Sequence, residues 1–177
     1  EVLKIARERP ARKVGESAKD NIIVHHWSEK NQRVDVLESS TVERLRALEL
    51  EMDRDVLAYY PQVRCAGVIR PEKKNVTSGT VDFMVVRKSG VCFEECKALG
   101  TLHSLISTKP DEWVLQDSGN VVRPPYARWA AERSSMHKVW TPPARFATYL
   151  SNLQLIYAMR MIQEAYADGV RELVIKS

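Results

Sequence analysis

Three residues of the chain combine the acidic and basic groups that hydrolysis of a phosphodiester requires. Asp82 lies within the apolar stretch TVDFMVV, and Glu95 and Lys97 follow in the segment FEECK. A carboxylate inside an apolar strand is unfavourable unless it is paired or bound to a metal ion. Residues two apart on a strand point to the same face, so we expect Glu95 and Lys97 side by side. A hairpin turn between the two segments would bring Asp82 next to them.

This set of groups predicts a metal-dependent nuclease. Carboxylate oxygens are the ligands that Mg²⁺ prefers, and Mn²⁺ accepts the same ligands. A pair of such ions would neutralise the scissile phosphate and activate water, and a lysine beside them would orient or deprotonate that water. An Asp followed by Glu-x-Lys is the motif of the PD-(D/E)xK nucleases. The same residues also suit a structural explanation, in which Asp82 or Glu95 forms a buried ion pair with Lys97, or the strand end leans into solvent.

The motif is expected on a hairpin that follows a long helix. Ser40 and Glu43 have the spacing of a capping box, and VERLRALELEMDRDVLAYY then continues as a strong helix former until Pro61 ends it. Apolar stretches bounded by turn residues predict strands, and residues 87–90 have the composition of a tight turn between two of them. The predicted strands are 63–69, 80–86, 91–97 and 136–141, a polar turn covers 72–79, a second helix covers 126–134, and weaker strand candidates cover 22–27 and 33–37.

The order of the predicted elements is helix, three strands, helix, strand and helix. This order predicts an α/β fold with a mixed sheet flanked by helices. It matches the αβββαβ order of the restriction-endonuclease-like core. Residues 98–122 show no regular pattern and are expected to form a long loop. The last helix is predicted over 144–167, ending at Asp168-Gly169.

A carboxylate from the first helix would complete the metal site, and two residues compete for this place. At about 100° per residue, Leu45, Leu48 and Met52 belong to one apolar stripe of the helix. Glu49 lies inside this stripe, whereas Glu43 falls on a second flank. Periodicity alone therefore favours Glu49, although a Glu at the edge of an amphipathic face would show the same pattern.

The segment 40–63, STVERLRALELEMDRDVLAYYPQV, resembles the endonuclease subunit TnsA of heteromeric cut-and-paste bacterial transposons. That family shows S-x-L-E, an L-x-L-E-W-E-like run, a V-L pair and a Gln. The matching residues here are Ser40-Thr-Val42-Glu43, Leu48-Glu-Leu50-Glu51-Met52-Asp53, Val56-Leu57 and Gln62. The matching segments elsewhere are Ser28-Glu-Lys30-Asn-Gln-Arg33 for S-x-K-x-G-R, Val81-Asp82-Phe83-Met84-Val85 for T/P-D-F-L-V, Glu95-Cys96-Lys97 for Q/E-x-K, and Lys138-Val-Trp140-Thr141 with Asn152-Leu153 for W-x-V/I-x-T and N-L.

The resemblance spans residues 28–160 and implies a restriction-endonuclease-like fold with Mg²⁺-dependent nicking of transposon ends. It implies that Glu43, the Glu of S-x-L-E, is the helix acid in place of Glu49. Glu43, Asp82 and Glu95 would then ligate the metal, and Lys97 would complete the catalytic set. The implied partners are transposon-end DNA, the DDE transposase subunit TnsB, which cuts the other strand, and the ATPase regulator TnsC. Gln32, where the family often has Gly, departs from the pattern.

Two other functions stay open at this stage. The chain could be another PD-(D/E)xK nuclease that serves restriction or repair, or a non-catalytic DNA-binding subunit with a spent active site. A neighbouring gene for a DDE transposase favours the transposon function, and a neighbouring methyltransferase gene favours restriction.

The charge distribution adds a weaker indication of a polyanionic partner. The formal net charge is +4 and the isoelectric point is about 9.0, which is compatible with nucleic-acid binding. Basic residues gather between positions 121 and 149, where a solvated surface is the alternative to a phosphate-contacting face. The residues expected to contact DNA are Arg123, Arg128, Arg133 and Lys138.

The domain organisation is expected to have a catalytic core with short flanks. We expect an N-terminal arm over 1–27, the endonuclease domain over 28–167, and over 168–177 a linker or the start of a winged-helix-like domain. The first residue is not Met, which is compatible with a fragment or with a fusion to the transposase. The cysteines form no CxxC pair and read as buried thiols of a cytoplasmic protein, and no apolar run is long enough for a membrane span.

Overall fold

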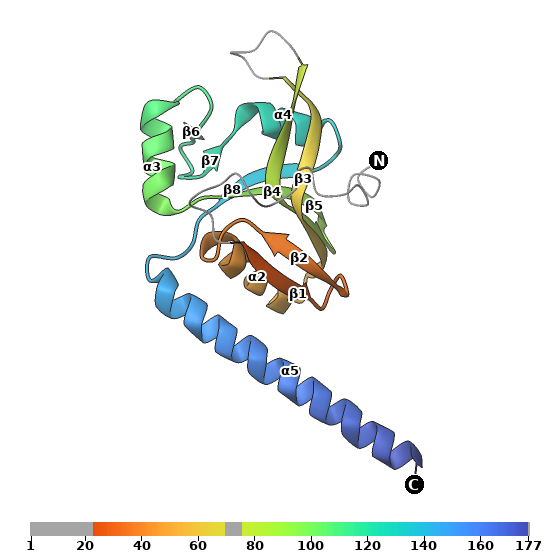
Figure 1. The fold of residues 1–177 in the computed structure, drawn as a ribbon. Coiled ribbons are helices and arrows are strands. Elements are labelled where there is room, and N and C mark those ends of the chain that lie inside the picture. The colour runs from red at the N-terminus through yellow and green to blue at the C-terminus, as the bar shows by residue number, and fades with distance from the viewer. Residues whose placement is uncertain (1–22, 70–75, 177) are drawn as a thin grey trace. The chain divides into compact units, whose positions relative to one another are not determined.

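The structure is a computed structural model that describes residues 23–69 and 76–176. The chain divides into two units, one up to Pro142 and one from Pro143 (Figure 1). The first unit holds a mixed sheet with helices packed on its faces, and the second consists of helix α5 (Phe146–Lys176). Within the described residues, no helix has both the length and the apolar character needed to cross a membrane.

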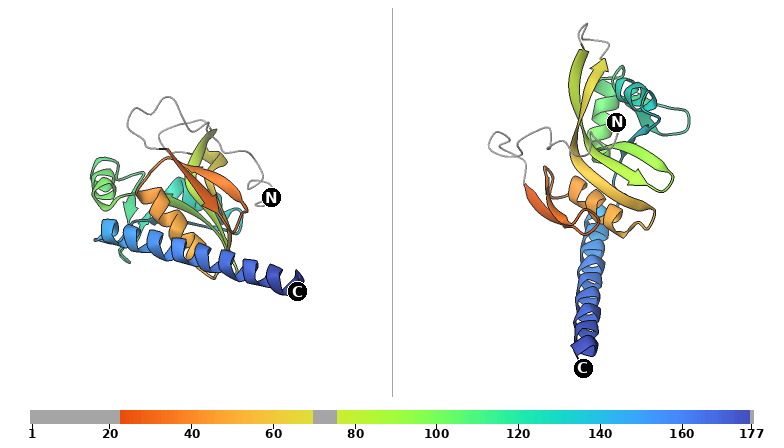
Figure 2. Two further views of the ribbon diagram at one scale, coloured as in Figure 1. Left: turned by 60° about the horizontal axis from the view of Figure 1, so that its bottom comes forward. Right: turned by 90° about the vertical axis from the view of Figure 1, so that its right-hand side faces the viewer.

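The main sheet has four strands in the order β3-β4-β5-β8. Strands β3 (Val56–Ile69), β4 (Val76–Arg87) and β5 (Gly90–Cys96) pair antiparallel in sequence, and β8 (Met136–Trp140) pairs parallel to β5. The ribbon shows β3 and β4 continuing as a two-stranded arm beyond β5 (Figure 2). These pairings confirm the prediction of a mixed α/β sheet flanked by helices.

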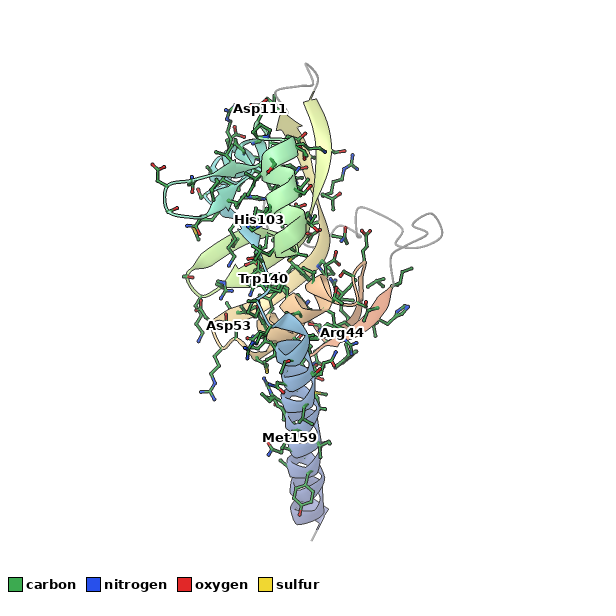
Figure 3. The ribbon with its side chains drawn as sticks, turned by 90° about the vertical axis from the view of Figure 1, so that its left-hand side faces the viewer. Arg44, Asp53, His103, Asp111, Trp140 and Met159 are labelled. Atoms are coloured by element: carbon green, nitrogen blue, oxygen red, sulfur yellow. The ribbon has the colours of Figure 1, made fainter. Side chains whose placement is uncertain are left out.

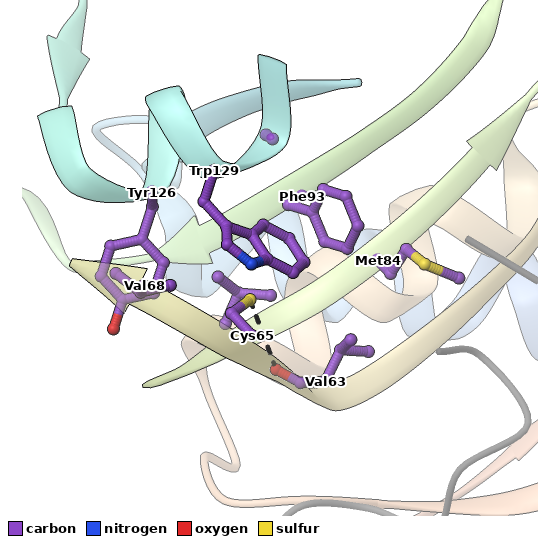
Figure 4. Packing of buried hydrophobic residues seen from close by; sticks show 9 residues of the cluster. Val63, Cys65, Val68, Met84, Phe93, Tyr126 and Trp129 are labelled. Carbon is purple, nitrogen blue, oxygen red and sulfur yellow. Dashed lines mark hydrogen bonds between the residues drawn. The ribbon is translucent and has the colours of Figure 1, made fainter. Parts of the chain in front are cut away.

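Helices α2 (Val42–Met52) and α4 (Pro124–Ala131) cover the sheet through separate apolar clusters. Two prolines at the start of α4 lack only N–H groups that the first turn of a helix leaves unpaired. The α2 cluster contains Leu37, Ala47, Leu50, Val56, Tyr59, Phe83, Val85 and Cys96. The α4 cluster, drawn in Figure 4, contains Val63, Cys65, Val68, Val81, Met84, Phe93, Tyr126, Trp129 and Ala130.

The connection 98–122 is folded, and the prediction of an irregular loop was wrong. Residues Leu99–Thr108 form helix α3, and the short strands β6 (Val114–Leu115) and β7 (Val121–Val122) pair antiparallel. Gly100 and Pro110 were interpreted as loop signals, although Leu102, Leu105 and Ile106 between them have helical spacing. The elements share a small core of Leu102, Trp113 and Val121, against which Leu105, Ile106 and Val139 pack.

Helix α2 ends at Met52, so the prediction that it continues to Tyr59 was wrong. The Asp53 carboxylate accepts the N–H of Asp55 at 2.9 Å, a local bond that competes with further helix. The Lys30 ammonium donates to the carbonyl oxygens of Asp53 and Val56. The segment VLAYY, rich in residues that favour strands, then opens β3.

Pro61 lies inside β3 and does not end a helix as predicted. The missing N–H is tolerated there because β3 is the edge strand of the sheet. The predicted capping box was also wrong. Ser39 Oγ accepts the N–H of Val42 at 3.1 Å, and the Glu43 carboxylate accepts the N–H of Glu38 at 2.8 Å instead of that of Ser40.

The remaining predicted boundaries hold in part. Strands over 33–37, 91–97 and 136–141 are confirmed in type, and the candidate at 22–27 becomes β1 (Val24–Ser28), which pairs with β2 (Arg33–Leu37). The predicted turn 72–79 overlaps β4 from Val76 onward, and its first part lies outside the described residues. Helix α5 continues through Asp168-Gly169, where its end was predicted. Most of the predicted arm 1–27 also lies outside the described residues.

Candidate active site

Asp82 lies where the sheet splits. The β4–β5 ladder ends at the pair Phe83↔Glu94, and before Phe83 the only described strand that pairs with β4 is β3. Residues two apart on a regular strand share a face, yet Val81 packs in the α4 cluster and Phe83 in the α2 cluster. On β3, Gln62 has a positive φ of 52°, which is uncommon for residues other than Gly. The alternation of side chains along β4 is therefore interrupted next to Asp82, and Asp82 itself lies just outside the β4–β5 pairing.

The structure brings Asp82, Glu95 and Lys97 together. The Lys97 ammonium lies 2.9 Å from Glu95 Oε1 and 3.3 Å from Asp82 Oδ2. The backbone N–H of Cys96 donates to the same Asp82 oxygen at 2.7 Å. The backbone N–H of Lys97 donates to the Trp140 carbonyl at 3.0 Å, so β8 holds the end of β5 in place. The two carboxylates and the ammonium thus form one cluster fixed by backbone contacts.

Of the two candidate helix acids, the structure brings Glu43 to this cluster. Glu43 is buried, and its pKa responds to the charges of Asp82 and Lys97. Glu49 binds the Arg46 guanidinium at 2.8 Å, and Arg46 in turn binds Glu94 at 2.7 Å. Glu49 therefore belongs to a different ion-pair network on α2.

The cluster holds several acidic groups, largely shielded from water, close to one lysine. Burial, followed by the charge of Asp82, raises the pKa of Glu43 to about 8. Burial, followed by the charge of Glu95, raises the pKa of Asp82 to about 6. Burial alone would lower the pKa of Lys97, but the charges of Asp82 and Glu95 outweigh it and hold that pKa above its usual range.

This charge balance fits a divalent cation. Carboxyl groups with raised pKa values are those whose ionised forms need further positive charge, and oxygen ligands suit Mg²⁺ or Mn²⁺. Within residues 23–69 and 76–176, no three His, Cys, Asp or Glu side chains are already arranged around one metal position. Instead, the Lys97 ammonium bridges Asp82 and Glu95. Glu43, Asp82 and Glu95 are the residues that would hold the ion.

Arg123, expected at a DNA-contacting surface, is buried beside this cluster. Its guanidinium donates to Glu95 Oε2 at 3.1 Å and lies 3.8 Å from Glu112 Oε2. The rings of Trp113 and Tyr126 lie 4.7 Å and 4.2 Å from its guanidinium carbon. Its position next to Glu95 was missed, because a contact between residues far apart in sequence leaves no periodic signal.

The other basic residues expected to contact DNA lie in different environments. Arg128 is exposed. Arg133 is half-buried, with its guanidinium carbon 4.2 Å from the centre of the Trp129 ring. Lys138 lies 3.0 Å from Glu94 Oε1.

Glu94 and Glu95 are neighbours with opposite surroundings. Glu94 is fully buried and receives two hydrogen bonds from Arg46, at 2.7 Å and 2.9 Å. Glu95 turns to Lys97 and Arg123. Strand alternation, which sends successive side chains to opposite faces, thus separates a structural carboxylate from one in the candidate site. The sequence alone did not reveal the Arg46–Glu94 pair.

Neither a protein-family model nor a curated protein sequence matches this chain. The interpretation of the site therefore depends on its own geometry and charges.

Proposed function

We propose that the protein is a Mg²⁺-dependent DNA endonuclease of the PD-(D/E)xK class. The observation that carries the proposal is the convergence of Asp82, Glu95 and Lys97 at the split between β4 and β5, with Glu43 of α2 beside them. Acid, acid and lysine on one hairpin, completed by a helix acid, is the set that metal-dependent phosphodiester hydrolysis requires.

The element order supports a restriction-endonuclease-like core. Helix α2, the antiparallel strands β3, β4 and β5, helix α4 and the parallel strand β8 follow the αβββαβ pattern. In this comparison, α3, β6 and β7 are an insertion between β5 and α4.

The roles of the residues follow from their contacts. Glu43, Asp82 and Glu95 would bind the metal, which when bound neutralises the scissile phosphate and lowers the pKa of a water molecule. The Lys97 ammonium, which contacts both carboxylates, would orient the attacking water and balance charge on the phosphate. The Cys96 N–H donates to Asp82 Oδ2, the oxygen that Lys97 also contacts, so the Asp82 carboxylate is already oriented in the metal-free protein.

We further propose that the DNA is a transposon end. The resemblance to TnsA spans residues 28–160, and the acid that it selects, Glu43, is the one that lies near Asp82 and Lys97. In this proposal the protein nicks the strand that the DDE transposase TnsB leaves uncut, under the ATPase regulator TnsC, in the bacterial cytoplasm.

The proposal predicts that Asp82→Ala and Glu95→Ala abolish Mg²⁺-dependent nicking while the proteins remain folded. Asp111→Ala is a matched control, because Asp111 is an exposed acid of the same unit (Figure 3). Nicked products are measured on gels with the partner transposase present, and folding is checked by circular dichroism. Nicking that persists undiminished in both site variants would overturn the proposal.

A further inference from the structure

Both carboxylate oxygens of Glu95 are occupied by cationic side chains. Lys97 lies 2.9 Å from Oε1, and Arg123 donates to Oε2 at 3.1 Å. Glu95 and Arg123 are both buried, so their charges are poorly screened by water. Each carboxylate oxygen of Glu95 thus has a cationic partner without a metal ion.

Arg123 is held in this position from several sides. Its guanidinium carbon lies 4.7 Å from the centre of the Trp113 ring and 4.2 Å from that of the Tyr126 ring, and the guanidinium also faces the Glu112 carboxylate. Trp113 belongs to the small core formed by α3, β6 and β7, and Tyr126 belongs to the α4 cluster. The folded connection 98–122 therefore builds one wall of the slot in which Arg123 lies.

We propose that Arg123 is a positioning residue and a built-in counter-ion of Glu95, and that it competes with the divalent cation for this carboxylate. This inference rests on the proposed function, since it takes Glu95 as a metal ligand. Arg123 keeps Glu95 oriented before the metal binds, at the expense of metal affinity.

The electrostatic sign follows directly from the geometry. A guanidinium in contact with a ligand oxygen repels an incoming dication. Removing its charge also leaves Glu95 less compensated in the metal-free protein, which favours metal binding further. Both effects act in the same direction, so a neutral residue at position 123 should raise the affinity for metal.

The test is calorimetric titration of the full chain with Mn²⁺. Arg123→Gln and Arg123→Met remove the charge, and Met keeps a long unbranched side chain that can contact the two rings. Arg123→Lys keeps the charge. Lys109→Gln is the matched control, because it removes one exposed positive charge from the same connection. Thermal unfolding shows which variants are folded before titration.

We expect the neutral variants to bind Mn²⁺ roughly tenfold or more tightly. Arg123→Lys and Lys109→Gln should stay close to wild type. In a Glu95→Gln background, Arg123→Gln should have little further effect, a coupling that a merely structural residue would not show. Unchanged or weaker binding by the folded neutral variants would overturn the inference.

Failure of the proposed function has a different signature. If wild type binds Mn²⁺ and Asp82→Ala does not, the metal site stands whatever the variants at 123 do. If wild type itself binds no Mn²⁺, the metal site and the inference are both overturned.

Discussion

Glu43 and Asp82 place a buried and a half-buried carboxyl group near the single ammonium of Lys97, and this imbalance defines the chemistry at the residue scale. The pKa values of both acids are raised, to about 8 and about 6. A carboxyl group in such surroundings gains most when a cation arrives. Glu49, paired with Arg46, has no such need.

The two helix acids should therefore differ when neutralised. Glu43→Gln is expected to lower Mg²⁺-dependent nicking on the order of 100-fold, the scale on which single electrostatic contacts to a transition state act. Glu49→Gln should leave nicking close to wild type, because Arg46 retains Glu94. Initial nicking rates of the two proteins decide between them, and the reverse ranking would assign the helix acid to Glu49.

His137 gives a prediction about stability that is independent of catalysis. Both of its ring nitrogens are buried and find no hydrogen-bond partner among residues 23–69 and 76–176, and burial lowers its pKa from 6.5 to about 4. The charges of Glu95 and Glu94 oppose this lowering of the pKa, and the charge of Arg123 adds to it. The centre of the Tyr126 ring lies 5.7 Å from that of the His137 ring. Between pH 6.5 and about 4, His137 is therefore protonated in the unfolded chain but stays neutral in the folded protein.

The free energy of unfolding should consequently fall as the pH drops through this window. In His137→Gln, the free energy of unfolding should fall by about 1–3 kcal/mol less than in wild type over the same pH range. His103→Gln, which changes an exposed histidine, should leave the slope unchanged. Urea unfolding between pH 7 and pH 4 measures the slopes, and equal slopes for wild type and His137→Gln would contradict the lowered pKa.

At the scale of elements, local signals were predictable and long-range ones were not. The hairpin with Asp82, Glu95 and Lys97 followed from apolar strands and a turn. The end of α2 did not, because it depends on the Lys30 ammonium, which approaches from a distant hairpin. For the same reason, periodicity alone chose Glu49: the direction that Glu43 faces depends on where the sheet splits.

The arm formed by β3 and β4 gives a prediction about element packing. A Cβ atom added at Gly79 would lie 2.0 Å from the Tyr126 hydroxyl and 2.7 Å from Cζ of that ring. Tyr126 is a buried member of the α4 cluster and cannot move without disturbing it. Gly79→Ala should therefore lower the free energy of unfolding by about 1–3 kcal/mol.

Gly100 provides the matched control for this substitution. A Cβ atom there would meet no atom of the described part of the chain within 4 Å, and Gly100 lies in helix α3. Gly100→Ala should leave stability unchanged or raise it by up to about 1 kcal/mol. Thermal melts compare the two variants, and equal stabilities would contradict the packing of α4 on β4.

On the scale of the whole molecule, the proposed catalytic set lies entirely within the unit that ends at Pro142. Glu43, Asp82, Glu95 and Lys97 come from α2, β4 and the end of β5, while β8 and the folded connection 98–122 hold their surroundings. The motif and the order of the core elements could be predicted, whereas α3, β6, β7 and the surroundings of Arg123 required the tertiary structure. The net charge of +4 is compatible with a DNA partner.

The most direct test of the central claim is strand-resolved cleavage of DNA that carries a transposon end, in Mg²⁺, with the partner transposase present. The proposed function predicts that wild type nicks the strand that the transposase leaves uncut, and that Asp82→Ala leaves only the transposase cut. The proposed function is contradicted if Asp82→Ala still makes both cuts, or if the wild-type reaction shows the transposase cut alone.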